Sequence, residues 1–392
     1  MKDAVFMILF TTEISIKHRI VLNNYWAILG VGNIPSKLLV NQLIVYKNTI
    51  QLSDEEWELL LRQARAAGVI SRLAFFWKEF GLLAPPNFVA PHLNSAYKYW
   101  MSQKRLVNWE LYNLQQIFEQ LQLPLILLKG TAYLAANLNA GLGRVFSDID
   151  ILVPKHRLQD VKERLKWHGW YPEKMDGYDR RYYERWMHEL PPMRHVQRGT
   201  TLDVHHNILP ETCTLCPEAE LLLKAAVKIP GSDCWVLAPE DMILHSASHL
   251  FWGGEFDNGL RDLSDMDLLL REFSRNDMGF WQKLLGRANV LGMARPLFYA
   301  LRYSVKMLHT PVPDAVLQNP ALTVSGGFKN RVMDMLFIPA LMPIHPSCSD
   351  RWTGFARWLL YIRSHWLKMP WYLLILHLSR KAWMRLTGKE QH

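Results

Sequence analysis

The feature that most constrains this chain is a short segment of alternating acidic and aliphatic residues, Ser147-Asp148-Ile149-Asp150-Ile151-Leu152-Val153. Alternate side chains of a β-strand share one face, so Asp148 and Asp150 point the same way, roughly 6.6 Å apart at about 3.3 Å per residue. The aliphatic residues between them then point into a core. Two like charges on one face repel, and a bound cation offsets that repulsion. The segment predicts a strand with a metal site; a solvated pair of aspartates at a sheet edge is the alternative.

A third acid lies further along the chain, again between aliphatic residues. In Leu202-Asp203-Val204 the neighbours are expected to face the core and Asp203 the cleft. Mg²⁺ prefers carboxylate and phosphate oxygen, and two such ions can hold the attacking and leaving oxygens of an in-line displacement. Asp148, Asp150 and Asp203 are therefore the predicted catalytic residues and ligands of Mg²⁺ or Mn²⁺. Asp203 is also placed to accept the proton of an acceptor hydroxyl.

Basic and small residues at predicted element boundaries suit a triphosphate. Lys129-Gly130 follows the apolar run from Leu125 to Leu128, where a predicted buried strand meets a helix. Glycine there lets phosphate approach the backbone, and the helix N-terminus favours anions. Arg144 precedes the paired aspartates and is expected to neutralise phosphate charge, with Ser147 as a further substrate contact. A solvated side chain remains the alternative for both Lys129 and Arg144.

Histidines add possible contacts to this constellation. By the alternation of a strand, His205 shares the face of Asp203, where it can orient that acid or contact substrate. His245 and His249 are four residues apart on a predicted helix and share a face, a spacing that can bind zinc. No glutamate follows His245 as it does in the metalloprotease motif. A structural role, or a nucleotide contact from the helical part of the chain, is therefore favoured.

The order strand, Lys-Gly, helix, Arg, Asp-x-Asp and a later lone Asp resembles the DNA polymerase β-like nucleotidyltransferase superfamily. Within it, the chain is similar to the bacterial "uncharacterised nucleotidyltransferase" family over roughly residues 50 to 310. The resemblance implies a small mixed sheet backed by helices, with metal-dependent transfer of a nucleotidyl group from a nucleoside triphosphate. By that match Asp148 and Asp150 are the paired metal ligands and Asp203 the third acid. The matching pieces are Leu128-Lys129-Gly130, Ser147 to Val153, Leu202-Asp203-Val204-His205-His206, Pro239-Glu240-Asp241 and Ile243 to Leu250.

The chain departs from the superfamily at the phosphate grip. Many members have Gly-Ser or Gly-Gly where this chain has Lys129-Gly130, so either Thr131 replaces the serine as a phosphate contact or the grip differs. The acceptor stays open among sugars, lipid-linked glycans, small molecules and proteins. A catalytically inactive module that binds nucleotide or a partner at a membrane surface is the alternative to an enzyme.

The chain divides into regions by its patterning. Helical signals dominate the first third and return after Pro217, while the strands and a hairpin lie between them. Together with the resemblance, which implies the mixed sheet, this arrangement predicts an α+β fold, a small mixed β-sheet core flanked by helical regions at both ends. The predicted regions are a mostly helical 1–105, the α/β core 106–235, a helical domain 236–345, and a basic Trp-rich amphipathic tail 346–392.

The charge and the cysteine content indicate which partners and which cellular compartment to expect. The net charge of +9 and pI of about 9.3 indicate an anionic partner, such as phosphate, nucleic acid or an acidic membrane. No nucleic-acid-binding motif is present, so sequence-specific nucleic-acid binding is not expected. Four cysteines are too few for a disulfide framework, and ordinary thiols are favoured over a half zinc site at Cys213 and Cys216. Without a signal peptide or a spanning helix, a cytoplasmic location is predicted.

The last forty or so residues carry a pattern that is typical of contact with a membrane surface. Indoles suit the headgroup layer of a membrane, and cations suit anionic lipid, so the tail predicts peripheral contact with the inner membrane face. A packed C-terminal helix pair with a solvated basic face is the alternative. The residues concerned are Trp352, Trp358, Trp366, Trp371 and Trp383, with Arg357, Arg363, Lys368, Arg380, Lys381, Arg385 and Lys389.

Overall fold

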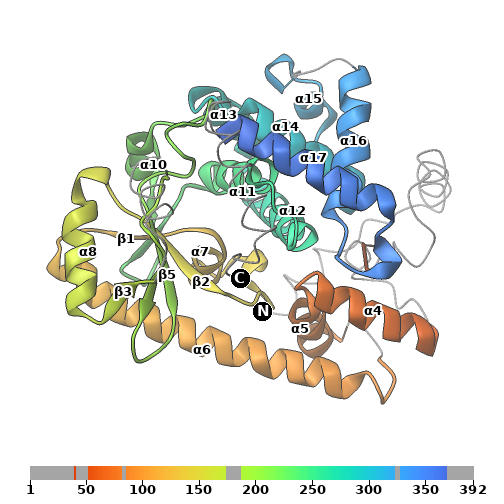
Figure 1. The fold of residues 1–392 in the computed structure, drawn as a ribbon, viewed down its shortest axis with the longest axis horizontal. Helices are drawn as coiled ribbons and strands as arrows, with labels where there is room; N and C mark the ends of the chain where they lie inside the picture. The colour runs from red at the N-terminus through yellow and green to blue at the C-terminus, as the bar shows by residue number, and fades with distance from the viewer. Residues whose placement is uncertain (1–38, 41–51, 82–84, 174–186, 323–326, 369–392) are drawn as a thin grey trace, which may run out of the picture.

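The computed structural model describes residues 39–40, 52–81, 85–173, 187–322 and 327–368. The fold is α+β: one seven-stranded mixed sheet lies to one side of the molecule, and helices from both ends of the chain flank it (Figure 1). The predicted fold class is therefore confirmed. The expectation that the chain start is no signal peptide concerns residues outside the described ranges.

The sheet places the two strands that carry the aspartates side by side near its middle. β2 (Asp148–Leu152) and β5 (Thr201–His205) are parallel, and Asp150 is paired in register with Asp203. The strand order is β3-β4-β5-β2-β1-β7-β6. The other strands are β1 (Leu125–Leu127), β3 (Trp170–Pro172), β4 (Met193–His195), β6 (Val227–Lys228) and β7 (Cys234–Val236).

The local sequence explains the central strands. Ile149 and Ile151 are buried on the core face of β2, as the alternation predicts, while Asp148 is half-buried on the other face. Asp150 is only 4% exposed, so this face is covered rather than open. The predicted hairpin is confirmed as β4 and β5, which pair antiparallel and turn at Gly199 with a φ of 71°, where glycine is favoured.

The N-terminal helices begin with a capping box that the sequence predicts. In α4 (Asp54–Ala66) the Glu56 amide donates to Ser53 Oγ at 3.2 Å, and the Ser53 amide donates to a Glu56 carboxylate oxygen at 2.9 Å. α5 (Ile70–Phe80) follows, and then α6 (Ala90–Gln120) runs along the sheet (Figure 1). α6 continues unbroken across residues 105 and 106, so the N-terminal region and the core share one helix.

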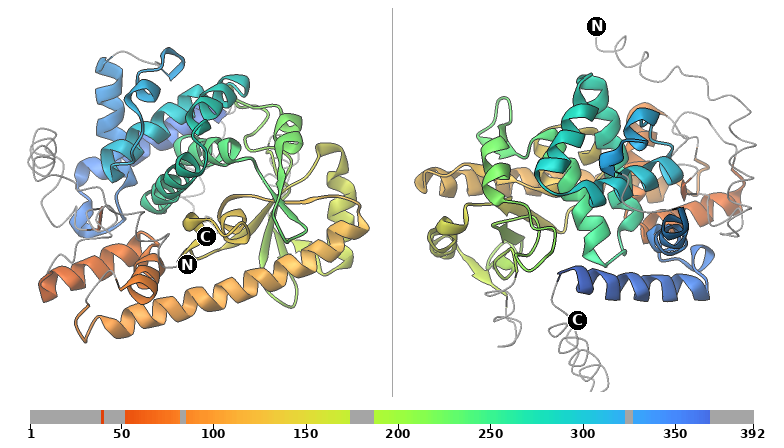
Figure 2. Two further views of the ribbon diagram at one scale, coloured as in Figure 1. Left: turned by 180° about the vertical axis from the view of Figure 1, so that it is seen from behind. Right: turned by 90° about the horizontal axis from the view of Figure 1, so that it is seen from above.

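The remaining helices pack around the sheet and beyond it (Figure 2). The sequence predicts a helix from Leu158 to Trp167, and α8 has these bounds. It also predicts that a helix begins at Pro239-Glu240-Asp241, as α11 does. These helices are α7 (Lys129–Ala135), α8 (Leu158–Trp167), α10 (Ala219–Ala225), α11 (Pro239–Gly253), α12 (Gly259–Asn276), α13 (Phe280–Val290), α14 (Ala294–Leu308), α15 (Asp314–Leu317), α16 (Gly327–Leu341) and α17 (Arg351–Lys368).

The described part of the predicted tail is α17, and it is packed into the helical region. The guanidinium of Arg363 lies 5.0 Å from the ring centroid of Trp252 and 5.4 Å from that of Tyr299, a cation–π arrangement. A side chain at Gly254 would collide with Ser364, so the helix lies directly on that backbone. Residues 369–392, with Trp371 and Trp383, are outside the described ranges. Within those ranges, no helix has both the length and the apolar character needed to cross a bilayer.

All four cysteines are free thiols in the structure. Burial raises the pKa of the thiols of Cys213 and Cys216, which disfavours the thiolate that a metal requires. Among the described residues, no candidate metal-binding group contains a cysteine.

Candidate active site

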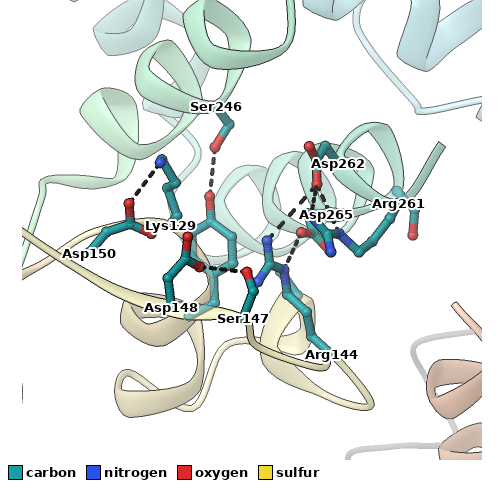
Figure 3. Close-up of polar contacts among 12 residues, drawn as sticks. Lys129, Arg144, Ser147, Asp148, Asp150, Ser246, Arg261, Asp262 and Asp265 are labelled. Carbon is teal, nitrogen blue, oxygen red and sulfur yellow. Dashed lines mark hydrogen bonds and ion pairs between the residues drawn. The ribbon is translucent and has the colours of Figure 1, made fainter. Parts of the chain in front are cut away.

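Asp148, Asp150 and Asp203, here called the aspartate cluster, lie on one face of the central strands. The in-register pairing of β2 with β5 sets Asp150 opposite Asp203. One ligand atom each from Asp150, Asp203 and His205 lies within 4.8 Å of the others, which shows that His205 shares this face. Asp148 is one step further along β2, where it accepts a hydrogen bond of 2.8 Å from Ser147 Oγ (Figure 3).

Lys129 and His205 neutralise the most buried acid of the cluster. Nζ of Lys129 lies 2.7 Å from Oδ1 of Asp150 (Figure 3), and Nε2 of His205 lies 3.0 Å from the same oxygen. Burial alone would raise the pKa of Asp150, but Lys129 and His205 hold this pKa well below its ordinary range. Lys129 has a φ of 48°, a left-handed conformation that is strained for lysine and directs α7 away from β1.

Asp203 is the acid that lacks compensation. Its Oδ1 is buried and has no hydrogen-bond partner among the described residues. Burial, followed by the negative charges of Asp150 and Glu189, raises the pKa of Asp203 to about 7. A divalent cation close to Asp203 would therefore offset a repulsion that the protein side chains leave in place.

Glu189 belongs to this site, although sequence reasoning missed it. It pairs with His205 through an isolated antiparallel bridge, and its Oε2 lies 3.1 Å from Nδ1 of His205. His188 precedes it, and its ring centroid lies 5.3 Å from that of His205. Neither residue lies in an alternating or helical pattern, and their approach to β5 depends on a tertiary pairing.

Arg144 and Thr131 are engaged within the protein. Nε of Arg144 donates to Oδ2 of Asp265 on α12 at 2.6 Å (Figure 3). Its guanidinium lies directly over Gly130, where an added Cβ would come within 1.8 Å of Nη1, so the glycine makes room for this arginine. Thr131 is 1% exposed, and its hydroxyl donates to the Leu128 carbonyl at 3.1 Å. The structure brings Lys129, but not the Thr131 hydroxyl, to the aspartate cluster.

A family model described as "Uncharacterised nucleotidyltransferase" matches residues 53–309. The chain belongs to this family. The match confirms the resemblance seen in the sequence and supports nucleotidyl transfer as the class of activity. It spans the aspartate cluster and Lys129, and it ends before α17. No curated protein and no solved structure matches the chain.

In this member of the nucleotidyltransferase family, the charge of Lys129 acts on two histidines of α11. Burial and the charge of Lys129 lower the pKa of His245 to about 3. The charge of Lys129 also lowers the pKa of His249, whose side chain is exposed. The lysine therefore favours the neutral form of both histidines. Lys368, at the end of α17, donates from Nζ to the Gly253 carbonyl at 3.1 Å, so the last described helix is joined to the end of α11.

A pocket of about 140 Å³ opens beside Asp148 in this nucleotidyltransferase. It lies between α6 and the β4–β5 turn and is lined on its polar side by Gln103, Glu110, Asp148 and Thr200. Glu110 is fully buried and accepts hydrogen bonds of 2.7 Å from both Arg198 Nε and Thr200 Oγ1. A cavity of this volume can hold one small ring. The pocket lies next to Asp148, which is the more exposed of the two aspartates on β2.

Proposed function

We propose that the protein is a metal-dependent nucleotidyltransferase that moves a nucleotidyl group from a nucleoside triphosphate to an acceptor hydroxyl. The observation that carries the proposal is the pairing of Asp150 with Asp203 on adjacent parallel strands, with Asp148 on the same strand as Asp150. Membership of the family supports the class of reaction.

The residues present fit a divalent cation. The ligand atoms of Asp150, Asp203 and His205 converge within 4.8 Å, and Oδ1 of Asp203 is a buried acceptor without a partner among the described residues. Asp148, Asp150 and Asp203 would hold Mg²⁺ or Mn²⁺ through carboxylate oxygen, the donor that these ions prefer. When bound, the ion neutralises charge on the triphosphate and orients it.

The chain's own residues supply the remaining chemistry. The acceptor oxygen attacks the α-phosphorus, the bond from that phosphorus to the oxygen bridging to the β-phosphate breaks, and pyrophosphate leaves. Asp203 takes the proton from the acceptor hydroxyl, and Lys129 supplies positive charge for the phosphates. His205 orients Asp150, to which it lies hydrogen-bonded. Ser147 lines the pocket beside Asp148, where a substrate group would enter.

The other predicted phosphate contacts require side chains to leave their present partners. Arg144 reaches a phosphate after it leaves Asp265, to which it is bound at 2.6 Å. Gly130 and Thr131 lie at the start of α7, where backbone amides favour anions. The Thr131 hydroxyl would have to exchange the Leu128 carbonyl for phosphate.

Calorimetric titration of the full chain with each nucleoside triphosphate tests the proposal. With Mg²⁺ present, one triphosphate is expected to bind with a Kd between about 1 μM and 1 mM. Because the cluster repels phosphate without its cation, EDTA should weaken that binding by at least about tenfold, or 1.4 kcal/mol. Binding that is equally tight in EDTA would contradict a metal-dependent donor site.

A second candidate function is a catalytically inactive nucleotide- or partner-binding module at a membrane surface. It is favoured by three exposed aromatic residues of α17, Trp352, Phe355 and Trp358, here called the aromatic face. Their rings stand in a row with centroids 5.4 Å and 5.8 Å apart, and their exposed fractions are 40%, 45% and 55%. Arg351 lies exposed beside them and suits an anionic headgroup.

Co-sedimentation of the full chain with vesicles of phosphatidylcholine and phosphatidylserine tests the aromatic face. Phe355→Ser with Trp358→Ser is expected to lower vesicle affinity by at least about tenfold, since both rings would lose apolar burial in the interface. Trp109→Ser with Tyr112→Ser is the matched control, because those exposed rings are also stacked, 5.9 Å apart, but lie on α6. Equal sedimentation of all three proteins would contradict membrane docking through α17.

A further inference from the structure

Beside the aspartate cluster lies a second group of side chains of the kinds that bind transition metals. His188, Glu189 and His205 each offer one ligand atom, and these atoms lie within 4.8 Å of one another. Oε2 of Glu189 is already 3.1 Å from Nδ1 of His205. Ligand atoms that share one tetrahedral Zn²⁺ at about 2.0–2.2 Å lie roughly 3.3 Å apart, so small side-chain shifts would complete a shell here.

The sheet holds this group in place. Glu189 pairs with His205 as an antiparallel bridge, and the His206 amide donates to the His188 carbonyl at 2.8 Å. The backbone therefore fixes both segments, and only the side chains need to adjust to a ligand. Preorganisation of this kind is what a metal site needs to bind without a large ordering cost.

Two nitrogens of the group make no hydrogen bond with any residue that the structure describes. Nδ1 of His188 is buried, and Nδ1 of His205 is buried 3.1 Å from Oε2 of Glu189. A buried polar atom without a hydrogen bond is destabilising, which makes such atoms uncommon in folded proteins. A metal ion between the two rings would satisfy both nitrogens at once.

The orientation of His205 is that of a metal ligand. When Nδ1 takes a metal, Nε2 carries the proton, and here Nε2 lies 3.0 Å from Oδ1 of Asp150. Metal-binding histidines commonly donate their other ring N–H to a carboxylate, which fixes the ring and increases its basicity. Asp150 would serve as that carboxylate, outside the metal's own shell.

We propose that His188, Glu189 and His205 bind a divalent transition-metal ion such as Zn²⁺, at a site distinct from the oxygen-rich aspartate cluster. Imidazole nitrogen favours Zn²⁺ and Co²⁺ over Mg²⁺, so the two neighbouring sites select different ions. Three protein ligands leave one position open for water or a substrate atom. The proposal goes beyond nucleotidyl transfer and stands whether or not the chain is an active transferase.

A protonated His205 between two carboxylates is the competing arrangement. An imidazolium would donate from Nε2 to Asp150 and from Nδ1 to Glu189, with a proton in the place of the metal. This arrangement leaves Nδ1 of His188 without a partner and predicts no stoichiometric binding of a transition metal. Metal binding by the purified protein therefore separates the two arrangements.

The test uses the full chain without an affinity tag, stripped with EDTA, dialysed and titrated with Co²⁺ in a large excess of Mg²⁺. Excess Mg²⁺ would fill the site proposed at the aspartate cluster, and the visible absorption of Co²⁺ reports nitrogen ligation at low coordination number. We expect one equivalent of Co²⁺ to bind, and Zn²⁺ to displace it. His188→Ala and Glu189→Gln should each weaken Co²⁺ binding by at least about 100-fold, because outer-shell losses alone cost 10–100-fold.

His156→Ala is the matched control, since His156 is exposed on the surface and should leave Co²⁺ binding unchanged. Glu189→Gln keeps the side-chain shape, so it remains informative if His188→Ala fails to fold. Wild-type protein that binds no stoichiometric Co²⁺, or equal Co²⁺ affinity in wild type and both site variants, would overturn the proposal. Mg²⁺-dependent triphosphate binding is measured separately in Glu189→Gln, so failure of the metal site and failure of the transferase proposal are distinguished.

Discussion

Asp148→Asn is expected to lower nucleotidyl transfer by roughly 10³-fold or more while the protein stays folded. The asparagine keeps the shape of the side chain but removes the negative charge that would bind the cation. Asp148 is half-buried, and the contact described for its carboxylate is the hydroxyl of Ser147 at 2.8 Å. An asparagine oxygen can accept that same hydrogen bond, so little stability should be lost.

Asp150→Asn should lower both the rate of nucleotidyl transfer and the stability of the folded protein. Lys129 and His205 both approach Oδ1 of Asp150, and their charges would lose their partner in the variant. Breaking a buried pair from one side costs up to about 3–5 kcal/mol. Comparison of the two variants therefore separates the catalytic effect, which both share, from the folding effect, which belongs to Asp150.

Pyrophosphate release with the triphosphate identified by calorimetry is the measurement, and circular dichroism checks the fold of each variant. Asp233→Asn is the matched control, because its side chain is 85% exposed on the β6–β7 turn and pairs with Lys228. It should keep wild-type turnover. Turnover by Asp148→Asn within tenfold of wild type would remove Asp148 from the catalytic assignment.

The strands that carry the acids could be predicted because their signal is local. Alternation in β2 placed the aliphatic residues in the core, and the same alternation placed His205 on the face of Asp203. The capping box of α4 and the bounds of α8 were also local patterns. α6 begins at Ala90, with Pro91 tolerated in its first turn.

The parts that sequence reasoning missed are those that depend on distant residues. β3, β6 and β7 have two or three residues each, too few to show a period of two. Cys234 carries no local signal for a strand, yet it pairs in parallel with Leu125 of β1. His188 and Glu189 reach β5 through a single bridge, and a tertiary contact of that kind leaves no trace in local composition.

The role of Arg144 shows the same limit. Its position before the paired aspartates predicted a phosphate contact, but the side chain points to Asp262 and Asp265 on α12 (Figure 3). Its partner lies 121 residues along the chain. In this structure Arg144 joins two regions of the chain, and its phosphate contact stays a prediction that requires the guanidinium to leave Asp265.

Asp265→Ala is expected to destabilise the protein by about 3–5 kcal/mol, the second large effect that we predict. Asp265 is 2% exposed and receives Nη2 of Arg72 and Nε of Arg144, each at 2.6 Å. Arg72 belongs to α5, Arg144 to the loop before β2, and Asp265 to α12, so one carboxylate joins three regions of the chain. Its loss would leave two buried guanidinium groups without their shared counter-charge.

Urea unfolding followed by tryptophan fluorescence measures this loss, and a double-mutant cycle identifies its cause. Adding Arg144→Met to Asp265→Ala removes one of the uncompensated charges, so the double variant should be more stable than the sum of the single variants predicts. Asp160→Ala is the control: its carboxylate pairs with Arg157 on the surface, and such pairs contribute about 0–1 kcal/mol. If Asp265→Ala unfolds at the same urea concentration as Asp160→Ala, the three regions are held together by apolar packing, and the buried arginines find other acceptors, such as the Ala140 carbonyl that Arg72 already contacts at 2.8 Å.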